Sequence, residues 1–414
     1  MLIVINKFKI MNLIFLCLVF DVFFLVFDGF RGLNFPNYFP FSFIRDILIF
    51  LPFFFIIPKI IKKNMLTKQA VIIYSLILFV LIYTFFTSLL ITIDNEQLAS
   101  LRGSYGTPII DIYGFGIGRW TKFFSMFAIS ITVYYLLLND EQGYYRKKLF
   151  DYYINFSFLY SILTILIYFL LPSVYETVGN NWSGRISIGY PTMDIYFLSC
   201  SLILLKYSNF TKIRKLGFSI IIIICLLLQN TTTGFILLFL ILFAYIVTSK
   251  FSVKILSLTT GIFLTYLISY IYYNYTDFDP IGTLLKLKLD SLFSFNTQSD
   301  PSYYIRLNQS NAMLQYLFSD SFTFLFGWGG MGSEATEINI YCILGFSGLI
   351  GLIVYILISI FVLLKSIIFR NEILFFLIIS FWITSISINP VYLYPAYWMF
   401  AFCIAYALTL KNQR

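Results

Sequence analysis

About twelve stretches of mostly apolar residues, each close to 20 residues long, run through this chain of 414 residues. A helix that crosses the ~30 Å hydrocarbon core of a bilayer needs about 20 such residues. Hydrophobic residues make up 60% of the sequence and charged residues only 11%, with a mean hydropathy of +0.87. Soluble domains do not have this composition. We therefore predict an all-α polytopic integral membrane helix bundle of about 12 transmembrane helices, with residues 1–414 as a single transmembrane domain.

The basic residues predict how the spans alternate. If Lys7 and Lys9 are cytoplasmic, later basic clusters such as 146–148 and 206–215 fall on the same side, which is the positive-inside pattern. Both termini are then cytoplasmic. The first span carries Asp21 and lacks a small-residue cleavage site, so we expect it to be retained. The predicted spans are 10–29, 41–59, 70–92, 121–138, 152–172, 192–206, 216–230, 234–249, 255–273, 337–364, 372–388 and 394–410.

The residue inventory excludes several kinds of chemistry. The chain has no histidine, so it lacks the commonest metal ligand and the commonest general base. We therefore expect no metal and no cofactor. The net charge of +9 comes from short loops between spans and not from a basic stripe, which argues against nucleic acid. The five cysteines fall in or beside apolar spans without a CxxC pair, as expected of small buried residues: Cys17, Cys200, Cys225, Cys342 and Cys403.

Three substantial segments are predicted to lie outside the membrane on the other side. Residues 93–120 contain Arg102 and Arg119, which we take as candidate substrate-binding residues. Residues 173–191 contain Arg185, and the large loop 274–336 contains Arg306. Within the large loop, residues 281–295 alternate apolar and polar side chains, which favours an amphipathic helix on the membrane surface or one packed over the bundle.

Two of these arginines lie in sequences that suit an anionic, glycosylated ligand. Arginine presents a planar fork that matches phosphate groups. Arg185 lies among small residues in WSGRISIGYPTMD, and Arg306 follows Tyr303 and Tyr304 and precedes Asn308 in YYIRLNQSN. Aromatic and amide side chains are common in sugar-binding surfaces, so we include these three in the candidate site. The alternative is an arginine that pairs with a carboxylate or lies among lipid phosphates.

A glycine-rich segment closes the large loop. FGWGGMG, at residues 326–332, precedes Glu334 and Glu337, and its backbone N–H groups are candidates for binding an anion. A tight turn that returns the chain to the membrane is the alternative. Glycines recur at 345, 348 and 351, which predicts one small face on the following helix. Glu337 and Asn339 would then lie at the external mouth of that helix.

Acidic residues in or near spans are candidates for function. Asp194 opens the sixth span shortly after Arg185. Asp21 lies deep in the first span, where a carboxylate is costly unless it is paired or functional. Pairing, with the region of Arg45 and Asp46 as partner, and function both remain open for Asp21. The short spans seven and eight are joined by NTTTG at 230–234, as either a full crossing pair or a shallower hairpin.

Together, these features resemble the Wzy family of O-antigen polymerases and the related O-antigen ligases. The resemblance rests on the arginine loop at 173–191, the short paired spans around NTTTG, the late loop with Arg306, and the return GWGGMG…EINIYCILGFSGLIGL. It covers about residues 170–365 in motifs and the whole chain in topology. An arginine-to-glycine spacing proposed for some polymerases is absent, because Leu317 and Tyr196 stand eleven residues after the two arginines.

The resemblance implies a periplasmic glycosyltransferase of the bacterial inner membrane. It would join oligosaccharide repeat units linked to undecaprenyl diphosphate, without metal or nucleotide sugar, and would work with a chain-length regulator protein. Arg185 and Arg306 match the two arginines of the family's two periplasmic loops, which would hold the diphosphates. Glu337, Glu334 and Asp194, in that order, are the candidates for the general base.

Three other functions remain as alternatives. O-antigen ligases carry a histidine near the return of the loop to the membrane, where this chain has Glu337 and Asn339. A lipid-linked oligosaccharide flippase should carry cations inside its spans, and these spans hold almost none. A small-solute permease does not explain a large polar loop.

Overall fold

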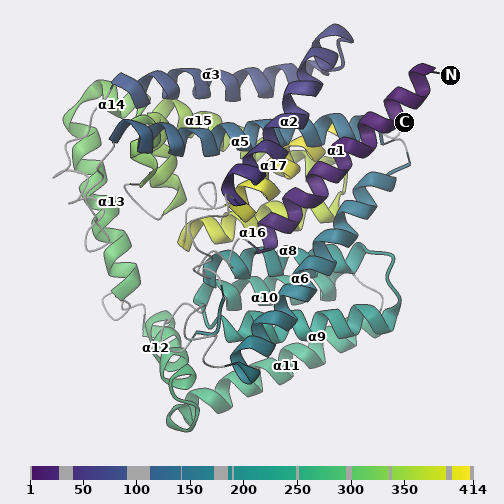
Figure 1. Cartoon of the computed structure of the whole chain (residues 1–414). Coiled ribbons are helices and arrows are strands. Elements are labelled where there is room, and N and C mark those ends of the chain that lie inside the picture. The colour runs from purple at the N-terminus through teal and green to yellow at the C-terminus, as the bar shows by residue number, and fades with distance from the viewer. Residues whose placement is uncertain are drawn as a thin grey trace. The chain divides into compact units, whose positions relative to one another are not determined.

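The computed structural model describes residues 2–27, 41–90, 112–140, 142–171, 185–188, 191–248, 251–294, 301–334, 338–387 and 394–410. Every regular element within these ranges is a helix, which confirms the all-α prediction (Figure 1). The elements are α1 (Leu2–Phe27), α2 (Phe41–Lys62), α3 (Lys68–Leu90), α5 (Ile112–Leu138), α6 (Tyr144–Leu170), α8 (Pro191–Tyr207), α9 (Lys212–Leu228), α10 (Thr232–Thr248), α11 (Phe251–Tyr273), η3 (Tyr275–Phe278), α12 (Ile281–Ser294), α13 (Pro301–Ser319), α14 (Ser321–Phe326), η5 (Gly329–Glu334), α15 (Asn339–Ile368), α16 (Glu372–Ser387) and α17 (Tyr394–Thr409).

Each predicted span coincides with one of these helices, although not all are long. Among the described residues, five helices have the length and composition to cross a membrane: Lys68–Leu90, Gly116–Leu138, Tyr144–Leu170, Val253–Tyr273 and Asn339–Ile368. Four shorter apolar helices accompany them, at Ile10–Val26, Thr232–Thr248, Glu372–Ile386 and Ala396–Thr409. The chain is thus built as a membrane protein, and a full set of twelve crossings stays a prediction.

One predicted boundary changes in the structure, and the large polar segment gains defined helices. Helix α5 begins at Ile112, so Arg119 lies inside a helix and not in a loop that ends at residue 120. The large polar segment is mostly helical, with η3, α12, α13, α14 and η5 following one another between 275 and 334. Helix α12, at Ile281–Ser294, matches the amphipathic helix predicted at 281–295.

The chain divides into two compact units. Unit 1 contains residues 1–17, 46–143 and 301–414, and unit 2 contains residues 18–45 and 144–300. The large polar segment therefore contributes to both units, with α12 in unit 2 and α13 in unit 1. Each unit is described by itself.

Unit 1 is built around α17. Every described side chain from Ala396 to Leu408 is buried, because α5 and α16 pack against this helix. Its aromatic residues make stacked contacts, such as Phe381 with Phe400 at 4.4 Å between ring centroids. Helix α5 also packs on α3 and stacks Phe123 on Phe346 of α15 at 3.7 Å. Large apolar side chains on the outer face of α3, such as Ile72 and Leu90, remain exposed, as expected of a surface that meets lipid.

Unit 2 is built around α8. All of its side chains from Asp194 to Leu205 are buried, and α6, α9 and α10 pack around it. Helix α11 packs on α10 and exposes most of its own length, including Phe263 and Tyr266. Helix α12 packs on η3 and α11. Several buried side chains of unit 2 are polar, among them Ser187, Asp194 and Gln229. The candidate site lies among these side chains.

Candidate functional site

Arg185 extends from a short anchored segment of unit 2. In the segment 185–188, Ile186, Ser187 and Ile188 are buried, whereas Arg185 is partly exposed. The backbone N–H of Ile186 donates to the carbonyl of Leu228 at the end of α9, at 2.9 Å. The backbone next to Arg185 is therefore fixed in place.

Asp194 anchors the same segment through its side chain. The carboxylate is 1% exposed and accepts two hydrogen bonds on Oδ2, from the hydroxyls of Tyr160 and Ser187, both at 2.6 Å. Asp194 also lies in the first turn of α8, where the helix dipole favours negative charge. It thereby ties α6, α8 and the Arg185 segment together.

These contacts place a polar site partway along a long helix. Tyr160 lies about 15 Å before the end of α6 at Leu170. Helices α8, α9 and α10 have 17 residues each, against 27 in α6. The shorter helices therefore end beside the middle of α6, and Asp194 and the Arg185 segment lie at that level.

The turn between α9 and α10 adds amide groups to this end of unit 2. Asn230 adopts a left-handed conformation with φ 47°, and its Nδ2 donates to the carbonyl of Ile281 at 3.0 Å. Gln229 is fully buried, and within the described part of the chain its Oε1 has no hydrogen-bond partner. The predicted NTTTG hairpin thus ends in a buried polar turn that also holds the first residue of α12.

Sequence reasoning missed the partners of Asp194. One signal was present, because Ser157, Tyr160, Ser161 and Thr164 recur at helical spacing on α6 and are all buried. Their polar stripe marked the face of α6 that turns toward α8. Nothing local in the sequence pairs Tyr160 with an acid 34 residues away.

Unit 1 holds Arg306 on the inward side of α13. Residues at i, i+4, i+7 and i+11 share one face of a helix, and here these are Arg306, Ser310, Met313 and Leu317. The last three are buried, and Arg306 at the end of the row is partly exposed. Asn308 is exposed on another side, so it does not share a face with Arg306.

The other predicted residues are two tyrosines near Arg306 and two arginines of the first external segment. The backbones of Tyr303 and Tyr304 lie in the first turn of α13, and their side chains fall outside the described residues. Arg102 lies outside the described residues altogether. Arg119 is partly exposed in the first half of α5.

The glycine-rich segment packs tightly and uses its own N–H groups. The N–H of Gly327 donates to the Thr323 carbonyl at 2.7 Å, that of Trp328 to the Gly345 carbonyl at 2.7 Å, and that of Gly330 to Ser88 Oγ at 2.8 Å. These three donors are not available to cradle an anion, so the tight-turn interpretation holds for them.

An N-cap precedes this segment. The carboxylate of Asp320 caps α14 by accepting from the N–H groups of Thr323 and Phe322, which lowers the pKa of that carboxyl below its usual value. The cap fixes the direction in which the chain enters the glycine-rich turn.

Asn339 is the first residue of α15, and the side of the membrane that this end faces stays a prediction. Its side chain is fully buried and donates from Nδ2 to the Tyr355 hydroxyl at 2.6 Å and to Ser385 Oγ at 3.4 Å. The contact with Tyr355 forms because α15 is broken at Gly348, whose φ 60° and ψ −168° are not helical. Glu334 ends η5 with its side chain outside the described residues, and Glu337 lies outside them.

The break also corrects the predicted small face at 345, 348 and 351. Its freed backbone groups are bonded from elsewhere in unit 1. The Tyr83 hydroxyl donates to the Ser347 carbonyl at 2.6 Å and lies close to Gly351, since a Cβ built there would be 2.8 Å from that oxygen. In a continuous helix the Ser347 carbonyl would accept from the N–H of Gly351. At this break the carbonyl accepts from the tyrosine hydroxyl.

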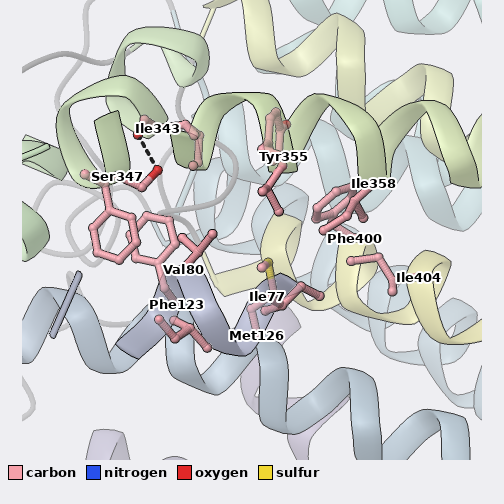
Figure 2. Close-up of a pocket in the computed structure, with 14 residues that line it drawn as sticks. Ile77, Val80, Phe123, Met126, Ile343, Ser347, Tyr355, Ile358, Phe400 and Ile404 are labelled. Carbon is pink, nitrogen blue, oxygen red and sulfur yellow. Dashed lines mark hydrogen bonds between the residues drawn. The ribbon is translucent and has the colours of Figure 1, made fainter. Parts of the chain in front are cut away.

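A small cavity lies beside this break. It has a volume of about 60 Å³ and is lined by α3, α5, α15 and α17. Figure 2 shows Ser347 and Tyr355 at its wall among apolar side chains such as Ile77, Phe123 and Phe400. The Ser347 hydroxyl is bonded to the Ile343 carbonyl at 2.8 Å, so the cavity presents a mainly apolar surface (Figure 2).

Two further observations bear on the kind of site. All five cysteines are free and buried, as predicted. Among the described residues, no group of three or more histidine, cysteine, aspartate or glutamate side chains could hold a metal ion.

No family model matches the sequence, and no curated protein matches it. The chemistry of the site therefore rests on its residues.

Proposed function

We propose that this protein is an O-antigen polymerase, a glycosyltransferase that joins oligosaccharide repeat units carried on undecaprenyl diphosphate. The observation that carries the proposal is Arg185, a partly exposed residue on a segment anchored by Leu228 and Asp194. A preorganised cation suits a diphosphate, since its position need not be established when the ligand binds. The reaction and its substrates are those implied by the resemblance of the sequence to the polymerase family.

In the proposed reaction, a hydroxyl of the acceptor repeat unit attacks the anomeric carbon of the donor glycan. The bond from that carbon to the acceptor oxygen forms, and its bond to the diphosphate oxygen breaks. Undecaprenyl diphosphate leaves with the electron pair, and a carboxylate accepts the hydroxyl proton. Arginine stabilises the charge that develops on the leaving diphosphate.

The two arginines suit the two lipid-linked substrates of such a reaction. Arg185 belongs to unit 2 and Arg306 to unit 1, and both are partly exposed. For Asp194 we favour positioning over general-base catalysis, because it is buried and its Oδ2 already accepts from two hydroxyls. Glu337 and then Glu334 remain the proposed bases.

The proposed location is the bacterial inner membrane. Twelve crossings, cytoplasmic termini and periplasmic arginine loops follow from the charge pattern, and the bacterial inner membrane follows from the family resemblance. Membrane lipid and a chain-length regulator protein are the implied partners, with no nucleic acid, metal or cofactor. The repeat-unit sugars are left open.

A lipid-linked oligosaccharide flippase is the second candidate. The break in α15 at Gly348 favours it, because discontinuous helices are frequent in transporters. The break also fits a polymerase, since it seats the glycine-rich segment.

Lipopolysaccharide from a strain that lacks this protein tests the proposal. A core that bears a single repeat unit, with no ladder on a gel, is the result expected for a polymerase. Bare core with long polymer on the lipid carrier would indicate a ligase. Bare core with single units held on the cytoplasmic side would indicate a flippase, and an unchanged ladder would exclude all three.

A further inference from the structure

The first turn of α9 carries two lysines on one side of the helix. Lys212 and Lys215 are three residues apart, so their side chains are neighbours on the helix surface. The side chain of Lys212 is exposed and that of Lys215 is partly exposed. Like charges on neighbouring positions of a helix repel each other. An anion bound between the two lysines removes that repulsion.

The end of α8 brings a third lysine to this pair. Lys215 Nζ donates to the backbone carbonyl of Lys206 at 2.9 Å. Lys206 Nζ in turn donates to the Thr248 hydroxyl and lies 4.7 Å from the centre of the Tyr207 ring. The ends of α8 and α10 and the start of α9 therefore meet within unit 2. We call Lys206, Lys212 and Lys215 the lysine cluster.

The arginine of the same turn faces a different helix. Arg214 donates to Asn155 of α6 at 2.7 Å, and its guanidinium lies 4.1 Å from the centre of the Phe210 ring. Asp151 of α6 interacts electrostatically with Arg214 and Lys148. Arg214 and Asp151 thus belong to the contact between α6 and α9, and we do not include them in the lysine cluster.

The three helices that carry the lysine cluster bring no acid to it. Among the described residues of α8, α9 and α10, Asp194 is the one acid, and it lies at the opposite end of α8 from Lys206. These helix ends therefore present a net positive charge.

Exposed apolar side chains continue along α9 from the lysine cluster. Leu216 and Ile220 follow Lys212 at i+4 and i+8 on the same face, and they are 49% and 48% exposed. Ile213, next to Lys212, is 86% exposed. Tyrosines are enriched at the membrane–water interface, and Tyr207 lies at the level of the lysines. The surface thus changes from cationic to apolar within one to two helical turns.

We propose that the lysine cluster, together with Leu216 and Ile220, binds one anionic phospholipid such as phosphatidylglycerol. The phosphate lies at Lys212 and Lys215, and an acyl chain follows Leu216 and Ile220. Lysines near a membrane surface attract anionic lipids. A soluble phosphate would match the lysines but not the apolar row, so we assign the site to a lipid. The charge pattern of the sequence predicts the cytoplasmic leaflet for this end of α9.

This site is separate from the proposed catalytic residues. It lies at the start of α9, whereas the Arg185 segment is bonded to Leu228 at the other end of that helix. The inference does not rest on the proposed function, and no outcome of the lipopolysaccharide test changes it.

Native mass spectrometry of the full chain, released from detergent with bound lipid, tests the proposal. Phosphatidylglycerol and phosphatidylcholine with identical acyl chains are titrated separately. We expect the wild-type protein to bind phosphatidylglycerol at least about fivefold more tightly. Lys212→Met should weaken phosphatidylglycerol binding about fivefold, as for the loss of one lysine near an anionic surface. The double variant Lys212→Met/Lys215→Met should lose the preference for the anionic lipid.

Lys147→Met is the matched control. Lys147 is another exposed lysine of unit 2, in the first turn of α6, and its substitution removes the same charge. Its affinity for phosphatidylglycerol should stay within about twofold of wild type. Lys212→Arg keeps the charge and should do the same. Lys212→Gln is a second neutral variant if the methionine variant does not fold.

Several results would overturn the proposal. They are equal affinity of the wild-type protein for both lipids, wild-type affinity in the Lys212 variants, and an equal loss in Lys147→Met, which would indicate that only net charge matters. Displacement of phosphatidylglycerol by an equal concentration of glycerol phosphate would indicate a site for a soluble phosphate and would contradict the assignment to a lipid.

Discussion

At the scale of single residues, Arg185 carries the proposed chemistry. We expect Arg185→Ala, and likewise Arg306→Ala, to abolish long chains while the protein still inserts into the membrane. Arg185→Lys should also fail, with at least about a tenfold loss of polymer, because lysine cannot bind phosphate bidentately. The measurement is a lipopolysaccharide gel from the complemented deletion strain, with membrane levels of each variant checked by immunoblot.

Arg214→Ala is the matched control for these variants. Arg214 lies in the first turn of α9, at the other end of that helix from Leu228, and it donates to Asn155 at 2.7 Å. Its loss should leave the ladder intact. Normal ladders from both Arg185→Ala and Arg306→Ala would refute the site assignment, and full activity of Arg185→Lys would indicate that charge alone is sufficient.

Tyr83 is the residue that closes the break in α15. Tyr83→Phe keeps the ring contacts with Phe79 and Phe326 but removes the hydroxyl between Ser347 and Gly351. We expect a loss of about 1–3 kcal/mol in stability, the cost of leaving buried backbone groups without partners.

Thermal unfolding of the purified protein in detergent measures this effect. Tyr266→Phe, at a side chain that is 68% exposed on α11, should change stability by less than about 0.5 kcal/mol. Equal stability of both variants would mean that the Tyr83 hydroxyl does not support the break.

At the scale of elements, the glycine-rich segment is a backbone-to-backbone contact. A Cβ added at Gly330 would lie 1.7 Å from the Gly116 carbonyl oxygen, and one at Gly332 would lie 1.9 Å from that of Gly345. Gly330→Ala therefore has to displace main chain, and we expect it to cost about 1–3 kcal/mol or more.

Gly118→Ala in α5 is the control for that substitution. A Cβ at Gly118 meets no atom within 4 Å, so alanine should be neutral or should stabilise the helix by up to about 1 kcal/mol. Detergent unfolding curves compare the two variants. Equal stability would contradict the packing described for the segment.

The elements also show how far the sequence alone could lead. Apolar length located every predicted span, and alternation located α12, because both signals are local. The break at Gly348 was missed, since the apolar run continues through it without proline. It exists because Leu325, Gly327 and Tyr83 approach from distant parts of the chain.

For the candidate site, the sequence identified residues but not the contacts that depend on tertiary packing. Arg185 and Asp194 were identified by their residue types, but the Tyr160 contact that buries Asp194 depends on tertiary packing. Asn339 begins α15 as expected, but its contact with Tyr355 could not be predicted, because it depends on the folding back of α15.

At the scale of the whole molecule, the described helices form an all-α membrane protein, and unit 2 holds buried polar side chains next to a segment with a partly exposed arginine. Asp194, through its two short hydrogen bonds, holds the segment that carries the partly exposed Arg185. We propose that this arrangement serves substrate binding. The polymerase proposal gives Asp194 and Arg185 a common purpose.

The most direct measurement is polymerisation by the purified protein in proteoliposomes. The substrate is lipid-linked single repeat units extracted from a strain that lacks the protein, with no nucleotide sugar added. We predict products of two or more repeats on one lipid carrier, with one undecaprenyl diphosphate released per linkage, and neither with Arg185→Ala. Repeat units that stay single with folded wild-type protein, whether or not they cross the bilayer, would contradict the account.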